Sequence, residues 1–331
     1  MINIEIKQWT SHHNHFMYSL LLYCESNRMV FKVKINKSLS SVGIVIKYNG
    51  KIAYLDYSDD FHFSDIPEKY DFYYKRSLKR EHMRHNIFPL NFQVNFAYHP
   101  YKMALKMPLD FNFIKQSKVE FSRAIDFLKI TNMSHFSMLL SKFKNSSTAN
   151  NGRVIFCTRL WDPKNTNDEE EKIRRERQNF FRINACRIIK ANYKNSFVGV
   201  FDSELARKLC PELIFNSKVL SKKAYLEELL KADICIADDG LKDSAGWKIG
   251  EYLMLGKAVI STPLNVYISD FYEGKNYMVL TNRASFEELP EKIDFLLEDD
   301  KYKQMGLNNK NWSEKYLFPN SYIENILKNL K

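Results

Sequence analysis

Short apolar runs alternate with longer amphipathic segments in the second half of the chain. Four runs have the length and flanking residues of buried strands, at 153–158, 196–201, 233–237 and 257–261. Apolar residues at helical spacing predict helices at 169–192, after Ser221, at 246–255 and in the tail from 285, with interruptions near Gly306 and Pro319. Short apolar strands separated by helices indicate a parallel sheet that is covered on both faces.

The first half has a less regular pattern, which we also interpret as α/β. We expect a helix at 15–25 and strands at 2–9, 29–35, 42–56, 70–77 and 92–98. The segment 42–56 is predicted to reverse direction at Tyr48-Asn49-Gly50-Lys51, because an Asn-Gly pair suits a two-residue hairpin turn.

The length of 331 residues favours two domains over one. Small and polar residues at 142–152 form the best linker in the chain. We therefore expect an N-terminal domain over 1–145 and a C-terminal domain over 152–331, with the last helix packing back on the first domain.

The two halves differ in charge and in histidine content. Residues 1–150 contain 21 Lys and Arg against 12 Asp and Glu, a net charge of +9, whereas residues 151–331 contain 29 against 27. All eight histidines lie between His12 and His135. A basic half suits an anionic ligand such as a phosphate, a nucleic acid or an acidic lipid headgroup, and composition alone leaves these three open.

Several features favour a cytoplasmic location. The longest nearly apolar run, 16–24, is about half as long as a membrane-spanning helix, and the N-terminus lacks the pattern of a secretory signal. The five cysteines are far apart and never in C-x-x-C spacing, which is typical of reduced thiols and not of disulfides or a zinc site.

Residues 233–262 carry the most informative chemistry: a strand, a glycine-containing loop, a helix and a second strand. Ligands of open α/β sheets bind beyond the carboxyl ends of the strands. A helix beginning near Gly246 directs free N–H groups toward a phosphate, and Lys248 in its first turn adds a cation. Glu251 lies one turn further on, where its carboxylate can hold ribose hydroxyls. The alternative is a surface helix with an ordinary Lys–Glu pair.

The run from Lys248 to Ile260, KIGEYLMLGKAVI, resembles the K-x-x-E-Y-x-x-x-G-K-P-V-I signature of GT-B-fold glycosyltransferases. Thr158-Arg159-Leu160 followed by Lys164 is similar to the G-R-L…K-G element after the first strand of their C-terminal domain. Asp243 lies eight residues before Glu251, and the two are similar to the E-x7-E pair of the retaining, group 1 members. The resemblance covers about residues 152–320.

The resemblance implies a GT-B architecture, with two Rossmann-like domains and an active site in the cleft between them. It implies that Arg159, Lys164 and Lys248 neutralise the diphosphate of a nucleotide-sugar donor, together with the helix end at Gly246. No separate cofactor and no metal are expected.

The same resemblance implies that Glu251 holds the nucleotide ribose and that Asp243 faces the transferred sugar. Asp243 is one methylene shorter than the family's Glu, and Ala258 replaces the usual Pro. These departures affect mainly the expected contact of Asp243 with the sugar. They affect the expected phosphate and ribose contacts less.

The first half supplies candidates for acceptor chemistry. His12 and His13 follow the first strand, and either can serve as a general base or a phosphate ligand; the alternative is a polar turn with solvent-facing histidines. Asp59 is a candidate base in a turn after a later strand. Residues with weaker cases are Asp56, Asp60, Lys75, Arg76, His99 and, for a Mg²⁺ site, Asp238 and Asp239.

We therefore predict a metal-independent glycosyltransferase of the hexosyltransferase type. Its acceptor would be a glycan or lipid-linked saccharide in bacterial surface-polysaccharide biosynthesis, reached by peripheral contact with an anionic membrane surface. One alternative is a nucleotide-sugar epimerase of the same fold. Another is a basic nucleic-acid-binding protein, although the sequence contains no recognised nucleic-acid motif and we expect no nucleic-acid partner.

Overall fold

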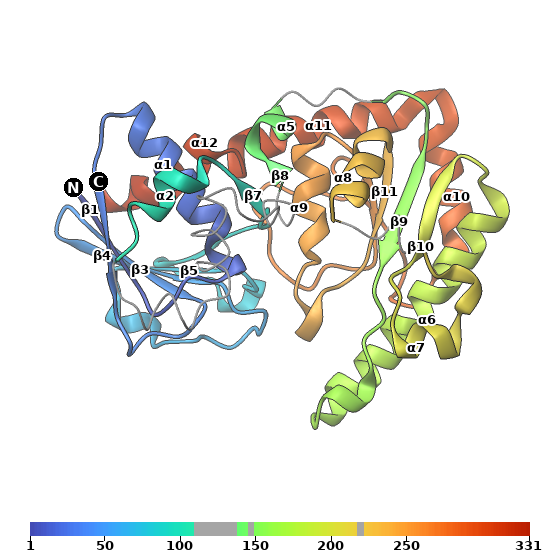
Figure 1. Cartoon of the computed structure of the whole chain (residues 1–331), viewed down its shortest axis with the longest axis horizontal. Coiled ribbons are helices and arrows are strands. Elements are labelled where there is room, and N and C mark those ends of the chain that lie inside the picture. Colours follow the sequence, from blue (N-terminus) through green and yellow to red (C-terminus); the bar gives the residue numbers. More distant parts are fainter. Residues whose placement is uncertain (109–137, 145–148, 217–221) are drawn as a thin grey trace. The chain divides into compact units, whose positions relative to one another are not determined.

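The computed structural model describes residues 1–108, 138–144, 149–216 and 222–331, and the chain divides into two compact units. Unit 1 comprises Met1–Phe143, Asn265–Ser269 and Ser313–Lys331, and unit 2 comprises Lys144–Leu264 and Asp270–Trp312. Figure 1 labels the elements along the sequence.

Unit 1 contains a six-stranded sheet with the strand order β2-β1-β3-β4-β5-β6. Its strands are β1 (Ile2–Ile6), β2 (Phe31–Ile35), β3 (Gly43–Tyr48), β4 (Lys51–Asp56), β5 (Phe72–Lys75) and β6 (Ile87–Pro89). Only β3 is antiparallel to its neighbours in this sheet, so the carboxyl ends of β1, β4, β5 and β6 meet at one edge.

The hairpin between β3 and β4 confirms the predicted turn. Tyr48 pairs with Lys51, which leaves Asn49 and Gly50 as the two turn residues. Both have positive φ, 50° and 79°, as a type I′ turn requires. Asn and Gly are the residues that adopt this conformation at the least cost, so the local sequence determines the turn.

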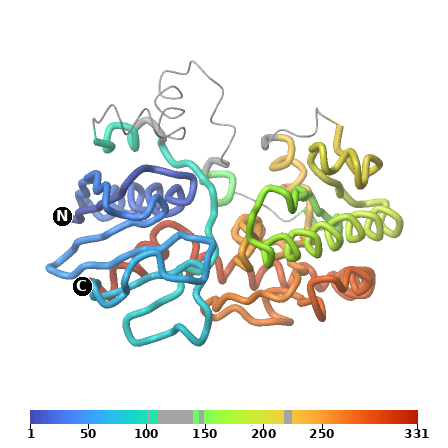
Figure 2. Tube along the Cα trace, turned by 90° about the horizontal axis from the view of Figure 1, so that it is seen from below, coloured from blue at the N-terminus to red at the C-terminus, as the bar shows by residue number. Residues whose placement is uncertain are grey.

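Helices α1 (Asn14–Ser26) and α12 (Pro319–Leu327) pack against each other in unit 1 although they come from opposite ends of the chain. Figure 2 shows both termini in this unit. The Tyr23 hydroxyl donates to Glu324 at 2.6 Å, and the His15 ring stacks on Tyr322 with 4.1 Å between ring centres. The unit also contains β7 (Phe96–Ala97), β8 (Met138–Leu139), α2 (Pro100–Ala104) and, across the unit boundary, α5 (Leu140–Lys144).

Unit 2 contains a five-stranded, wholly parallel sheet with the order β10-β9-β11-β12-β13. Its strands are β9 (Val154–Thr158), β10 (Ser196–Val200), β11 (Ile234–Ala237), β12 (Ala258–Ser261) and β13 (Met278–Val279). The helices are α6 (Glu169–Asn192), α7 (Glu204–Leu209), α8 (Lys222–Lys231), α9 (Trp247–Met254), α10 (Leu289–Leu297) and α11 (Lys301–Tyr316), whose last residues belong to unit 1.

The predicted α/β class is confirmed, and the predicted strands and helices of unit 2 agree closely with those observed. The expected interruption at Gly306 is wrong, because α11 continues through it. A Cβ on Gly306 would lie 2.3 Å from the Gly256 carbonyl oxygen, so this glycine permits close packing instead of ending the helix. Among the described residues, no helix is both long and apolar enough to span a membrane.

Candidate functional site

The order of strands in unit 2 creates a switch point between β9 and β11. Strands β9 and β11 are neighbours in the sheet. The strand that follows β9 in the sequence, β10, lies on one side of this pair, and the strand that follows β11, β12, lies on the other side. In doubly wound sheets, ligands bind beyond the carboxyl ends of the strands at such a point. The loops after β9 and β11, together with α9, contain every residue for which the sequence predicts contact with a donor.

The loop after β9 presents two cations. Arg159 directly follows the strand and is exposed, with its Cζ 5.7 Å from the centre of the Phe201 ring. Lys164 is also exposed and lies in a single 3-10 turn, where its backbone N–H donates to the Asp162 carboxylate at 2.9 Å. Both side chains are therefore accessible to an anion at the carboxyl end of β9.

Helix α9 begins close to the strand that precedes it. Gly246 is its N-cap, and a Cβ there would lie 2.5 Å from the Asp238 carbonyl oxygen. Glycine is therefore required at this position by the approach of two backbone segments. The loop that leads to the helix is closed by a 2.6 Å hydrogen bond from the Gly240 amide to the Ser244 carbonyl.

The two candidate residues on α9 lie in different surroundings. Lys248 is half-buried and donates from Nζ to the carbonyl of Cys157 in β9, which places its charge beside the loop that contains Arg159. Glu251 is buried. Burial raises the pKa of the Tyr225 hydroxyl, and Glu251 is one of the neighbours that raise it further.

Helix α6 holds both loops through buried arginines. Arg182 pairs with Asp238 at 2.6 Å and also donates to the Arg159 carbonyl. About two turns away along the helix, Arg174 donates to the Gly240 carbonyl at 2.9 Å and lies 3.4 Å from the Asp239 carboxylate. One helix face thus connects the end of β9 with the end of β11.

Asp243 is held by an arginine that the sequence analysis did not select. Arg283, which follows β13, pairs with Asp243 and lies 3.6 Å from Asp239. Its Nη2 atom is buried and has no hydrogen-bond partner among the described residues. Burial and the neighbouring Asp238 raise the pKa of the Asp239 carboxyl, whereas Arg283 and Arg174 oppose that rise.

Asp238 and Asp239 thus have arginine partners where a metal ion would otherwise compensate their charge. Within the described ranges, no group of three or more His, Cys, Asp or Glu residues is arranged to hold a metal ion. The absence of a metal from the reaction stays a prediction.

Unit 1 contains a second polar cluster at the carboxyl edge of its own sheet. Asp56, the last residue of β4, is fully buried and accepts hydrogen bonds from the Ser58 hydroxyl at 2.7 Å and the Tyr73 hydroxyl at 2.7 Å. Lys75, the last residue of β5, is fully buried and lies 3.2 Å from Asp56. Burial lowers the pKa of Lys75, and Asp56 opposes that shift. This ion pair is shielded from solvent on all sides.

His12, Asp59 and Arg76 converge at the same edge. Arg76 is buried and pairs with Asp59. Burial lowers the pKa of Arg76 to about 9. Burial, and then the charge of Arg76, lower the pKa of His12 to about 4. The structure therefore brings together one histidine and one carboxylate that the sequence analysis proposed as bases.

The other histidine candidates, His13 and His99, have different surroundings. His13 is fully buried, with its Nδ1 accepting from the Thr10 amide at 3.3 Å and its ring 6.0 Å from that of Tyr57. His99 is exposed and lies against Tyr98, with 4.4 Å between ring centres. The assignment of a catalytic base to either residue stays a prediction.

Three arginines were missed by sequence reasoning: Arg174, Arg182 and Arg283. The first two lie on one face of α6 with Gln178 between them, at intervals of four residues, and a polar stripe on the buried side of a predicted helix is a signal that could have found them. For Arg283 the sequence offers no signal, because its partner is forty residues away.

No protein-family profile matches the sequence, and no curated protein matches it. Among solved structures, the chain is similar to the C-terminal domain of a glycosyl transferase group 1 family protein (LpcC) from Francisella tularensis, at 15% identity and a TM-score of 0.35, over 49% of this chain and 84% of that chain.

Two further solved structures are similar over most of the chain. One is a glycosyltransferase from Rickettsia africae, at 10% identity and a TM-score of 0.42, over 97% of this chain and 82% of that chain. The other is Alr3699/HepE from Anabaena in complex with UDP and glucose, at 12% identity and a TM-score of 0.38, over 98% of both chains.

Proposed function

We propose that this protein is a glycosyltransferase that binds a nucleotide-diphosphate sugar at the carboxyl edge of the sheet in unit 2. One observation carries the proposal: the loop with Arg159 and Lys164 and the glycine-dependent start of α9 flank the same switch point, between β9 and β11. Cations and a helix N-terminus around one crevice suit a diphosphate.

The leaving diphosphate gains negative charge as the bond to the sugar breaks. Arg159, Lys164 and Lys248 would offset that charge together with the free N–H groups of α9. Groups that are held in place before the reaction stabilise such a developing charge most effectively. The contact of Lys248 with β9 and the contact of Arg182 with the Arg159 carbonyl both restrict the positions of these cations.

Glu251 would accept hydrogen bonds from the ribose hydroxyls. Its carboxylate is buried, so a donor that it holds is shielded from competing water. Asp243 has a different surrounding, because Arg283 compensates its charge. We propose that Asp243 faces the sugar only as part of this ion pair.

Unit 1 would supply the acceptor chemistry. His12 or Asp59 would take the proton of the acceptor hydroxyl as the hydroxyl oxygen forms its bond to the sugar and the nucleoside diphosphate leaves. We propose a hexosyl donor and a glycan or lipid-linked saccharide acceptor, as in surface-polysaccharide assembly. The net charge of +9 over residues 1–150 supports contact with an anionic membrane surface.

A panel of nucleotides and nucleotide sugars, screened by thermal shift and then by product analysis, tests the donor. Glu251→Gln should weaken binding of the nucleoside diphosphate by about 1–3 kcal/mol, the usual effect of losing a charged hydrogen bond. The matched control is Glu176→Gln, an exposed change on α6. Arg159→Ala, with exposed Arg177→Ala as its control, should weaken both donor binding and turnover.

Two results would contradict the proposal. Binding of no nucleotide or nucleotide sugar would exclude this class of enzyme. Conversion of the donor into an isomer without any acceptor would identify an epimerase, which uses the same binding elements.

A further inference from the structure

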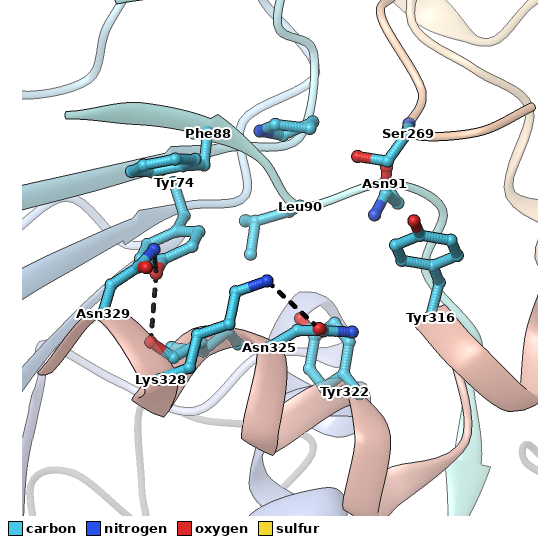
Figure 3. A pocket seen from close by; sticks show the side chains of 12 residues that line it. Tyr74, Phe88, Leu90, Asn91, Ser269, Tyr316, Tyr322, Asn325, Lys328 and Asn329 are labelled. Atoms are coloured by element: carbon cyan, nitrogen blue, oxygen red, sulfur yellow. Dashed lines mark hydrogen bonds between the residues drawn. The ribbon is translucent and has the colours of Figure 1, made fainter. Parts of the chain in front are cut away.

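Unit 1 contains a pocket of about 110 Å³ between its sheet and its last helix, outside the polar cluster at the carboxyl edge (Figure 3). Its lining comes from β5, from β6 and the segment after it, from Ser269, and from the chain between Tyr316 and Asn329. All these residues belong to unit 1. None of the residues assigned above to donor or acceptor chemistry lines it.

Aromatic rings form one side of this pocket. Tyr74 and Phe88 are paired across β5 and β6, with ring centres 5.5 Å apart and an angle of 31° between the rings. The Tyr74 hydroxyl donates to the Ile326 carbonyl at 3.0 Å and accepts from the Asn329 amide at 2.8 Å, so its ring is fixed in place. Figure 3 shows Tyr316 at the other end of the pocket.

Amide groups surround the space between these rings. Asn91 accepts a hydrogen bond from the Ser269 amide at 2.9 Å through its oxygen, and Figure 3 shows its nitrogen turned toward the pocket. Asn325 lies on the helix side, where its oxygen is 3.5 Å from Lys328 Nζ and its nitrogen donates to the Lys315 carbonyl at 2.8 Å. The twelve lining residues, all in the described part of the chain, include one lysine and no acidic residue.

We infer that this pocket binds a single sugar ring. A pyranose presents apolar C–H groups on its faces, which suit aromatic rings, and hydroxyls around its edge, which both donate and accept hydrogen bonds. The Asn91 nitrogen, which is turned toward the pocket, is a donor for one of these hydroxyls (Figure 3). A space of about 110 Å³ suits a ligand of the size of one ring and not a disaccharide.

The lining argues against a cationic ligand. Without a carboxylate in the lining, a metal cation or a polyamine has no counter-charge. The inference depends on this pocket alone and does not require that the proposed function be correct.

Saturation-transfer NMR with the full-length protein tests the pocket directly. The probes are the methyl pyranosides of glucose, galactose, mannose, N-acetylglucosamine and glucuronic acid, each at 10 mM. Uridine and adenosine are tested in the same way, because they represent the alternative ligand, a nucleobase. At least one pyranoside should bind, and binding should persist when UDP, GDP and ADP are present in excess. That persistence separates this pocket from a nucleotide-sugar site.

Phe88→Leu removes the ring but keeps an apolar side chain, and it should raise the dissociation constant of the pyranoside at least threefold. The matched control is Phe72→Leu, because Phe72 is a half-buried aromatic neighbour of Phe88 that does not line the pocket. Asn325→Ala, which replaces a half-buried residue on α12 and removes its hydrogen bond to the Lys315 carbonyl, is a second variant that should also weaken binding.

The inference is overturned if no pyranoside binds, if nucleosides bind in preference, or if Phe88→Leu and Phe72→Leu have equal effects. It is also overturned if the nucleotides displace the sugar. Sugar binding in a protein that lacks transferase activity would contradict the proposed function alone. Transferase activity without sugar binding at this pocket would contradict the present inference alone.

Discussion

Arg283 pairs with Asp243 and lies 3.6 Å from Asp239, so a single guanidinium serves two carboxylates at the carboxyl edge of the sheet in unit 2. The two acids differ in exposure: the Asp243 side chain is 40% exposed, whereas that of Asp239 is 6% exposed. The loss of stability on removing Arg283 should therefore come mainly from Asp239, because its buried carboxylate depends more on a positive partner than the exposed one does.

Arg283→Gln should lower the free energy of unfolding by about 2–4 kcal/mol, because it leaves the buried Asp239 carboxylate with Arg174, at 3.4 Å, as its remaining arginine partner. Asp243→Asn should cost less than about 1 kcal/mol, since an exposed ion pair contributes little. Urea unfolding of both variants measures the difference. The control is Arg187→Gln, which breaks an exposed pair with Glu212 and should have the smallest effect. Equal losses for the first two variants would contradict the dominant role of Asp239.

Gly246→Ala should weaken nucleotide binding and lower stability by about 1–3 kcal/mol. The added Cβ would lie 2.5 Å from the Asp238 carbonyl oxygen, so the start of α9 must shift relative to the loop after β11. Gly274→Ala is the control: it introduces a positive-φ alanine with no atom within 4 Å, so its strain should lower stability without changing nucleotide affinity. Isothermal titration with nucleoside diphosphates would separate the two effects.

His15 should make unit 1 less stable in mild acid. Its Nε2 contacts the Leu317 carbonyl at 2.8 Å and its Nδ1 accepts from the Val94 amide at 3.3 Å, an arrangement that requires neutral imidazole. Burial lowers its pKa to about 4. The folded state therefore binds fewer protons than the unfolded state between pH 4 and 6.5, and stability is lost as the pH falls through that window.

Between pH 6.5 and 5 the expected loss from His15 is about 2 kcal/mol, at 1.36 kcal/mol for each unit of pH. Hydrogen exchange of the α1 and α12 amides at the two pH values measures it. His15→Gln should have a smaller difference in protection between the two pH values than the wild type. An unchanged pH dependence in that variant would show that another group is responsible.

The low pKa of His12 predicts an unusual dependence of turnover on pH. With a pKa of about 4, His12 is already neutral at pH 5, so a reaction that uses it as the base should lose activity only near pH 4. His12→Ala should lower kcat by about 100-fold and leave nucleotide affinity nearly unchanged. His62→Ala, an exposed histidine, is the control. An acid limb near pH 6.5 would favour a different base.

Activity should persist in excess EDTA. Asp238 and Asp239 have buried arginine partners, and under the proposed function cationic side chains and the N-terminus of α9 would offset the charge of the diphosphate. Turnover measured with EDTA, and again after adding Mg²⁺ or Mn²⁺, tests this expectation. A complete loss that either cation restores would require a metal site instead.

Local sequence determined the parts of this protein whose conformation depends on neighbouring residues. Asn49 and Gly50 specify a hairpin turn because few residues tolerate positive φ. The start of α9 at Gly246 and the span of α6 follow from glycine placement and apolar periodicity. These features indicated the carboxyl ends of β9 and β11 as the candidate site, because the order of strands and helices predicts where a parallel sheet presents its loops.

Tertiary structure decided which polar residues have partners. His12 and His13 are adjacent in the sequence, yet one lies near Arg76 and the other packs against Tyr57, because the orientation of their short turn depends on the strands around it. Asp243 is similar to a catalytic carboxylate in the motif, but Arg283, forty residues away, compensates its charge. Such pairings depend on distances between strands and helices, and no local pattern of residues encodes those distances.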